Sequence, residues 1–205
     1  MPVPGSEQYM IKKFSIFALL ALILLPAGGM AAGVQGSSSI YGSPDDRAVT
    51  PLVSSVQTVA LTDDENYWLT YMREEEKVAR DVYLSLNEKW NLRIFKNIAA
   101  SEQVHMDAIK TLLDTYNIPD PATGKGRGEF TNPDLQELYD DLIQQGSISK
   151  VEALRVGVIT EETDIDDLNE GIATTRHNDI KTVYSNLLQG SLNHLDVFES
   201  SLAKL

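Results

Sequence analysis

Polar residues interrupt the apolar stripe of four segments of the sequence at a similar depth. In the segment 93–116 the interruption consists of Glu102 and His105, which project from one face of a helix because they lie three residues apart. Burying such groups among Ile and Leu is costly unless they are paired or bound to a metal. The interruptions in the other three segments are Glu76 (or Glu75), Glu161 (or Glu162), and Ser191 with His194.

These residue types match the ligands of a binuclear transition-metal site. Three carboxylates and two imidazoles that converge in one core can hold two ions. Oxygen and imidazole ligands suit iron, manganese or zinc, and the sequence has no cysteine for a soft-metal, Fe–S or disulfide site. One buried polar residue is usually satisfied by a neighbour, but four interruptions at matching depth favour a metal site.

The four segments carry local signals for long helices. Thr62 with Glu65, and Ser149 with Glu152, have the spacing of capping boxes. Asn132–Pro133 has the pattern of a helix start with proline in the first turn. We expect long helices over about 62–90 and 93–116, from 149 until Gly171 and 174–178 break it, and from about 178 onward, with a short helix over 133–146.

The spacing of the helices predicts the fold class. No segment alternates convincingly with a period of two, so we expect no sheet. Four amphipathic helices joined by short, long and short connections predict an all-α four-helix bundle over residues 61–205. The long, partly helical connection between the second and third long helices implies a crossover.

The N-terminal residues resemble a secretory signal. Lys12 and Lys13 precede an apolar run over 14–25, and small residues follow, with cleavage expected after Ala31 or Ala32. We therefore expect a signal peptide over 1–32, a flexible linker rich in Gly, Ser and Pro over 33–60, and a secreted or cell-envelope location. After cleavage no stable membrane span is expected.

The net charge of −13 argues against nucleic acid and anionic membrane surfaces as partners. It is compatible with uptake of metal cations, although an acidic solvated surface is the commoner meaning of such a charge. The expected partners are metal ions, with O₂ or peroxide as electron acceptor, and a homodimer is the candidate assembly.

Two motifs resemble those of known metalloproteins. The segment Glu76-Lys-Val-Ala-Arg80-Asp-Val-Tyr83 resembles the first-helix motif of rubrerythrins and bacterioferritins, and Glu102-Gln-Val-His105 resembles their Glu-x-x-His. Residues 61–205 as a whole resemble an uncharacterised ferritin-like domain family of archaea and bacteria. The resemblance implies a ferritin-like bundle with Glu76 rather than Glu75 as the first ligand, Glu102 as a bridging carboxylate and His105 as a terminal ligand.

The resemblance also implies one Glu on the third long helix and a His on the fourth. Periodicity favours Glu161 and leaves Glu162 open, while His194 occupies the matching position of the fourth helix. The segment Ser191-Leu-Asn-His194 departs from the family pattern, which has a second Glu-x-x-His there. A serine is a poor ligand, so water or a nearby acid, Asp164 or Asp166, would have to complete the second metal position.

Two functions are consistent with these residues. The first is an oxidoreductase that binds two iron ions, or manganese or zinc in their place, and oxidises Fe(II) or reduces O₂ or peroxide. The second is a non-enzymatic metal-binding or structural bundle with a degenerate site, which the serine at position 191 favours.

A few further residues receive simpler predictions. His177 is expected to be exposed in a turn, and the acidic runs 63–65 and 164–167 are expected to lie mostly on solvated helix faces. Tyr83 either donates a hydrogen bond to a metal ligand or packs in the core.

Overall fold

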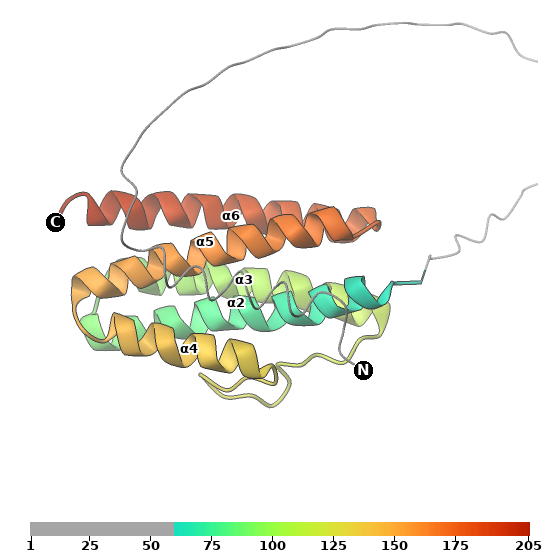
Figure 1. Ribbon diagram of the computed structural model, residues 1–205, viewed down its shortest axis with the longest axis horizontal. Coiled ribbons are helices and arrows are strands. Elements are labelled where there is room, and N and C mark those ends of the chain that lie inside the picture. Colours follow the sequence, from blue (N-terminus) through green and yellow to red (C-terminus); the bar gives the residue numbers. More distant parts are fainter. Residues whose placement is uncertain (1–59) are drawn as a thin grey trace, which may run out of the picture. The chain divides into compact units, whose positions relative to one another are not determined.

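The computed structural model describes residues 60–205, and these form helices and no strand (Figure 1). The predicted signal peptide (1–32) and residues 33–59 of the predicted linker lie outside the described residues. Within 60–205, no helix is long and apolar enough to cross a membrane. The helices are α2 (Asp63–Trp90), α3 (Arg93–Tyr116), α4 (Pro133–Gly146), α5 (Lys150–Thr174) and α6 (Asn178–Leu202).

The helices begin where their capping residues predict. The Thr62 hydroxyl accepts from the backbone N–H of Glu65 at 3.2 Å, and the Glu65 carboxylate accepts from the Thr62 N–H at 2.9 Å, so this capping box is complete. The Ser149 hydroxyl likewise accepts from the N–H of Glu152 at 3.1 Å. The second predicted capping box is formed only in this half, because the Glu152 carboxylate binds Gln145 and Arg155 instead.

Two asparagines end the first two helices in the left-handed conformation. Asn91 has φ 51° and Asn117 has φ 58°, and each N–H bonds back to a carbonyl of the last turn. Asparagine tolerates this conformation better than other residues with a side chain. The first cap makes the reversal between α2 and α3 only two residues long. Gly171 does not break α5, contrary to expectation, and lies inside its last turn.

The four long helices lie side by side (Figure 1). Helix α2 packs on α3, α5 packs on α6, and the two pairs meet through α2 against α5 and α3 against α6. In Figure 1 α3 and α5 run in the same direction, so the connection between them must carry the chain back along the molecule. Helix α4 forms part of this connection and packs on α2 and α5.

An aromatic cluster fills the core between α2, α3 and α6. The rings of Tyr83, Phe95 and Phe198 are fully buried, and their centroids lie 5.3 to 5.9 Å apart. Such offset pairs add to the free energy that burial of their area already contributes. The cluster fixes the register of the three helices one to two turns from the polar residues predicted to form a site.

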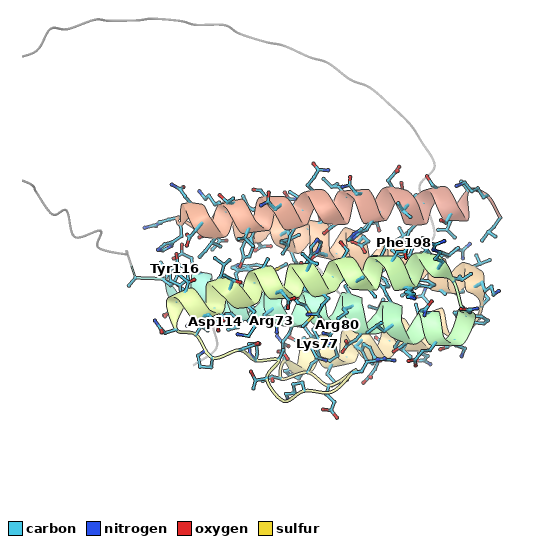
Figure 2. All side chains as sticks on the ribbon, turned by 180° about the vertical axis from the view of Figure 1, so that it is seen from behind. Arg73, Lys77, Arg80, Asp114, Tyr116 and Phe198 are labelled. Atoms are coloured by element: carbon cyan, nitrogen blue, oxygen red, sulfur yellow. The ribbon has the colours of Figure 1, made fainter. Side chains whose placement is uncertain are left out.

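The middle of α2 is buried on every face, from Tyr71 to Ala79. The reason is that the connection 117–132 covers the outer side of the helix. Arg73 donates two hydrogen bonds to Asp120, at 3.0 and 2.9 Å, and a third to the carbonyl of Met106 at 2.9 Å. Figure 2 shows Arg73 and Lys77 on this side of α2.

Further buried charges of α2 hold the same connection. The Glu74 carboxylate accepts from the N–H groups of Thr131 and Asn132 at 2.5 and 2.9 Å. The Lys77 ammonium binds Asp81 at 2.5 Å and the carbonyl of Gly126 at 2.7 Å. Buried charges are tolerated only when they are paired and hydrogen-bonded in this way.

Glu65 is buried and His177 is only partly exposed, which corrects the prediction for His177 and, within the run 63–65, for Glu65 alone, because Asp63 and Asp64 are exposed as predicted. The carboxylate of Glu65 is buried and accepts from the Thr175 hydroxyl at 2.9 Å, from the N–H of Arg176 at 2.7 Å, and contacts His177 Nδ1 at 2.8 Å. These contacts tie the start of α2 to the turn between α5 and α6. Burial by itself raises the pKa of Glu65, but the hydrogen bonds from Thr62, Arg176 and His177 outweigh it, so the pKa lies well below its usual range.

Candidate metal centre

Five of the polar residues predicted to form a site meet between the four long helices. Glu76 comes from α2, Glu102 and His105 come from α3, and Glu161 comes from α5; all four are buried. His194 comes from α6, and its side chain is 12% exposed. The meeting follows from the sequence pattern, because each residue lies at the middle of the apolar stripe that its helix turns toward the others.

The first group consists of Glu76, Glu102 and His105. The Nδ1 atom of His105 lies 2.8 Å from Oε2 of Glu102 and 3.3 Å from Oε2 of Glu76. One ligand atom from each of the three residues lies within 4.8 Å of the other two. The three-residue spacing of Glu102 and His105 on α3 places both on the side that faces Glu76.

The second group consists of Glu102, Glu161 and His194. The Nδ1 atom of His194 lies 2.9 Å from Oε1 of Glu102 and 3.4 Å from Oε2 of Glu161. Ligand atoms of these three residues also lie within 4.8 Å of one another. The two imidazole rings stack, with centroids 5.6 Å apart and an angle of 26° between their planes.

Glu102 belongs to both groups, with one oxygen facing each histidine. The four nitrogen–oxygen distances, 2.8, 3.3, 2.9 and 3.4 Å, can be compared with those around a metal ion. Two ligand atoms bound at about 2.1 Å to one ion lie about 3.0 Å apart at right angles and about 3.4 Å apart in a tetrahedron. The distances are compatible with donor atoms around a cation, and equally with ion pairs between protonated histidines and carboxylates.

Several of these buried atoms have no hydrogen-bond partner. They are Oε1 of Glu76, Oε1 of Glu102 and Nδ1 of His194. His194 Nδ1 and Glu102 Oε1 are only 2.9 Å apart, yet they are not aligned as donor and acceptor. Buried polar atoms are nearly always satisfied, so these acids and imidazoles need either protons that pair them as ions or a cation.

Protons balance the charges of the carboxylates and imidazoles. Burial by itself lowers the pKa of both histidines, but the facing carboxylates outweigh it and raise the pKa to about 11 for His105 and about 9 for His194. Burial raises the pKa of Glu76 and of Glu161 to about 7, while burial of Glu102 is outweighed by the two histidines, which lower its pKa. A metal ion that binds here must displace such protons, as is general for ligands of this kind.

Two neighbouring hydroxyls contact the candidate ligands Glu161 and His194 of the second group. The Tyr83 hydroxyl donates to Oε1 of Glu161, a candidate ligand, at 2.6 Å, and its ring packs on the aromatic cluster, which confirms the prediction of core packing. The Ser101 hydroxyl lies 3.0 Å from Nε2 of His194, the ring nitrogen turned away from the carboxylates. Bonds of this kind fix the orientation of metal ligands and the tautomer of a histidine.

Gly190 on α6 leaves the space that the His105 ring occupies. A Cβ atom at position 190 would lie 2.6 Å from Nε2 and 2.8 Å from Cε1 of His105. Contacts below 3.0 Å force one of the partners to move. A residue without a side chain at position 190 is therefore needed for the His105 ring to occupy its place in the first group.

Comparison with known proteins identifies the family of the chain. The model of a family described as an uncharacterized protein domain, DUF2202, matches residues 65–204. The chain belongs to the DUF2202 family. "Uncharacterized protein MJ0754" of Methanocaldococcus jannaschii is 52% identical to this DUF2202 chain over 146 residues, which cover 71% of this chain and 79% of that protein.

Two solved structures resemble this DUF2202 domain. The crystal structure of hypothetical protein MJ0754 from Methanococcus jannaschii has a TM-score of 0.71 and 51% identity, over 74% of this chain and 86% of that one. A fragment described as DUF305 from Deinococcus radiodurans has a TM-score of 0.58 and covers 72% of this chain and 100% of its own. At 13% identity, this second likeness concerns the helical fold alone.

Two of the candidate acids lie apart from the two groups of this DUF2202 domain. Glu162 is exposed, because it follows Glu161 directly and therefore lies about 100° further around α5. The structure thus brings Glu161, and not Glu162, to the other candidate residues, and Asp166 is exposed as well. Glu75 is buried, but it belongs to neither group.

Asp164 and Ser191 form a further buried contact in the DUF2202 domain. The Ser191 hydroxyl donates to Oδ2 of Asp164 at 2.5 Å, and the carbonyl of Leu187 is a second acceptor within its reach at 3.0 Å. The acidic run 164–167 was predicted to lie mostly in solvent, and for Asp164 and Asp167 this prediction is wrong because both are buried. Only the suggestion that Asp164 lies close to the site pointed to its position.

Proposed function

We propose that residues 61–205 form a ferritin-like four-helix bundle whose core binds two metal ions, iron in the first place, and that the protein oxidises Fe(II) with O₂ or peroxide. The observation that carries the proposal is the position of Glu102. Each of its carboxylate oxygens faces a different histidine, and each histidine faces a second glutamate. A carboxylate placed between two such groups is suited to bridging a pair of ions.

The course of the chain supports a ferritin-like bundle. Helices α3 and α5 run in the same direction and are joined by a connection that includes α4 (Figure 1). Ferritin-like folds are bundles with one such long crossover. The MJ0754 crystal structure, at 51% identity, offers a second molecule in which the same arrangement can be examined.

The residues of the chain would divide the work of the centre. Glu76 and His105 hold one ion, Glu161 and His194 hold the other, and Glu102 binds both. When bound, two Fe(II) ions supply the two electrons that, with two protons, reduce one hydrogen peroxide to two water molecules. The aromatic cluster and the buried aliphatic residues keep water from the ligands.

The ligand set is compatible with iron. Carboxylate and imidazole ligands suit iron, manganese and zinc alike, and the sequence offers no thiolate that would select a softer metal. Each group supplies two carboxylates and one histidine and leaves further positions open for an oxidant. Manganese and zinc are the alternatives, and competition between the metals in solution separates them from iron.

We further infer that the protein is exported. The basic residues Lys12 and Lys13, the apolar run 14–25 and the small residues that follow support a cleaved signal peptide. Expression in a bacterial host, followed by fractionation and N-terminal sequencing, tests this inference. A mature chain that begins near residue 32 supports export, whereas an intact N-terminus in the cytoplasm contradicts it.

A second function is favoured by a specific observation. Without any metal, the imidazolium groups of His105 and His194 already face the three glutamates as ion pairs, and α6 contributes Ser191 where a carboxylate would be expected. A buried set of ion pairs can serve fold specificity alone. In this alternative the protein is a metal-binding or structural bundle without turnover.

Anaerobic loading with Fe(II) separates the two functions. The purified protein is titrated with Fe(II), the metal per chain is counted, and O₂ or peroxide is added while near-UV absorption of oxo-bridged iron is followed. Two irons per chain and rapid oxidation support the oxidoreductase. Two irons without oxidation support the non-enzymatic alternative, and one iron or fewer contradicts the binuclear centre.

Matched variants assign the effect to the centre. Glu161→Gln removes a charge from the second group, whereas Glu162→Gln removes the same charge from its exposed neighbour. Glu102→Gln alters both groups. The proposal requires that Glu102→Gln and Glu161→Gln lose iron and that Glu162→Gln binds as the unaltered protein does. Equal iron binding by all three variants would sink the assignment.

A further inference from the structure

Helix α6 lacks one carboxylate that the symmetry of the two groups leads one to expect. On α3 a glutamate precedes the histidine by three residues, and on α6 the residue three before His194 is Ser191. Ser191 is fully buried, so its position faces the core as Glu102 does. The two groups together therefore hold three carboxylates, and the fourth position carries only a hydroxyl.

Asp164 lies directly against this hydroxyl. It comes three residues after Glu161 on α5, so both acids project from the same face of the helix. It is 5% exposed, and its Oδ2 accepts from Ser191 at 2.5 Å. The other oxygen, Oδ1, is buried and has no hydrogen-bond partner. An acid of α5 thus meets the position on α6 where the carboxylate is missing.

The surroundings of Asp164 are acidic. Burial, and after it the charges of Glu76 and Glu161, raise the pKa of Asp164 well above its ordinary value. Glu76 belongs to the first group and Glu161 to the second, so the negative charges of both groups act on Asp164. A carboxylate buried among other carboxylates must be neutralised by a proton or by a cation. The Ser191 hydroxyl donates a hydrogen bond but carries no positive charge, so it cannot neutralise Asp164.

We propose that Asp164 is the fourth carboxylate of the centre, that it binds metal through Oδ1, and that Ser191 is a positioning residue that holds Oδ2. The inference rests on the proposed metal centre and specifies its ligands. Asp164 belongs to neither of the close three-residue groups, so the proposal requires that Oδ1 turn toward the ions while Oδ2 stays on Ser191. The carboxylate that other bundles of this kind place on the last helix is here supplied by α5.

Metal titrations of two matched variants test this assignment. Asp164→Asn keeps the shape of the side chain and removes its charge, and Asp166→Asn makes the same change at an exposed position two residues away. The probes are Co(II), whose visible spectrum reports coordination, and anaerobic Fe(II). We expect Asp164→Asn to weaken binding of at least one ion by more than the ~10- to 100-fold typical of residues that only orient a ligand. Asp166→Asn should bind as the unaltered protein does.

Moving the carboxylate back to α6 supplies a second, independent test. In the double variant Asp164→Ser with Ser191→Glu the acid and the hydroxyl exchange helices, and we expect two ions per chain again. This variant also decides the matter if Asp164→Asn fails to fold, as judged by circular dichroism. A folded double variant that binds fewer ions than the unaltered protein contradicts the proposal that Asp164 is the fourth carboxylate.

The outcomes separate this inference from the proposed function. If the unaltered protein binds no metal, the proposed centre fails, and the ligand assignment fails with it. If the unaltered protein binds two ions and Asp164→Asn binds two with the same affinity and spectrum, only the role of Asp164 is overturned. A changed spectrum with weaker binding in Asp164→Asn, and its recovery in the double variant, establish Asp164 as a ligand.

Discussion

Gly190→Ala should damage one half of the centre while leaving the fold intact. The added Cβ would lie 2.6 Å from Nε2 and 2.8 Å from Cε1 of His105. The ring is held on its other side by Glu102 at 2.8 Å and by Glu76 at 3.3 Å, so it cannot move freely away. The substitution therefore acts on a candidate metal ligand through a residue that offers no ligand atom itself.

The size of the effect follows from the contact distances. Ordinary van der Waals contact begins at 3.4 Å, so Nε2 of His105 must retreat by about 0.8 Å from its present 2.6 Å. Ligand distances in metal sites hold to within about 0.2 Å, which is several times smaller than this displacement. We expect metal affinity at the group with His105 to fall at least tenfold, within the ~10- to 100-fold range that displaced ligand partners produce.

The stability of Gly190→Ala should change little. Overpacking costs about 1–3 kcal/mol, and replacing a helical glycine by alanine returns about 1 kcal/mol, so the net destabilisation is about 0–2 kcal/mol. At about 2–4 °C per kcal/mol the melting temperature should fall by less than about 8 °C. Thermal unfolding measures this change, and titration with Fe(II) or Co(II) measures the loss of affinity.

Gly171→Ala is the matched control. A Cβ there would lie 2.8 Å from Cε2 of Tyr184, a buried ring that belongs to neither group. It should lower stability by a similar amount and leave metal affinity unchanged. If Gly190→Ala and Gly171→Ala bind metal equally well, the inference that Gly190 positions His105 is refuted.

Three further predictions concern parts of the fold around the centre. Tyr83→Phe keeps the aromatic stack but removes the donor to Glu161, so the free energy of unfolding, measured with urea, should fall by about 1–3 kcal/mol. The pKa of Glu65 in the folded protein lies below its ordinary value of 4.5. The ionised Glu65 carboxylate therefore stabilises the fold above pH 4.5, and this stabilisation is lost as the pH falls from 4.5 through the folded-state pKa. Glu65→Gln should therefore flatten the loss of stability in acid, as followed by melting temperature from pH 7 to pH 3. Glu74→Ala removes two charge-assisted hydrogen bonds to the N–H groups of 131–132, so hydrogen exchange should show local opening easier by about 3 kcal/mol or more.

Each of these predictions has a contrary outcome. Unchanged stability in Tyr83→Phe would mean that water replaces the hydroxyl on Glu161. An acid-unfolding profile of Glu65→Gln parallel to that of the unaltered protein would contradict the low pKa. Exchange at 131–132 as slow in Glu74→Ala as before would show that other contacts hold the connection. Glu137→Gln, at an exposed acid of α4, is the control for the last case.

The helices could be read from the sequence because their signals are local. The pair Thr62 and Glu65, and the pair Asn132–Pro133, act within one turn, and the helices begin where these residues indicate. The position of Glu102 and His105 in the core followed from periodicity for the same reason. Periodicity favoured Glu161 and left Glu162 open. In the structure Glu161 is buried beside the other candidate residues, and Glu162, one residue further around the helix, is exposed.

The burial of the outer side of α2 could not be read in this way. Arg73, Glu74 and Lys77 look like a solvated face, because charged residues usually mark one. They are buried because a connection distant in sequence folds over them, and periodicity carries no information about that contact. Burial does not distinguish Glu75 from Glu76, since both are buried. In the structure the distance of 3.3 Å between Glu76 and His105 of α3 identifies Glu76 as the member of the first group.

The contact between Asp164 and Ser191 lay beyond local patterns for a related reason. The two residues are 27 positions apart on different helices, so no sequence spacing within one helix predicts their contact. From the sequence, Asp164 and Asp166 were equal candidates to complete the second metal position. The packing of α5 against α6 distinguishes them, because it buries Asp164 and leaves Asp166 exposed. Registers between helices depend on packing such as that of Tyr83, Phe95 and Phe198, which no single segment encodes.

The double use of Glu102 has a consequence for how such a chain can change over generations. A substitution at Glu76 or at Glu161 touches one group and leaves the other with its full set of side chains. A substitution at Glu102 touches both at once, because each oxygen serves a different histidine. A change at Glu76 or at Glu161 can therefore be tolerated by the other group, whereas any change at the shared position disturbs both groups together.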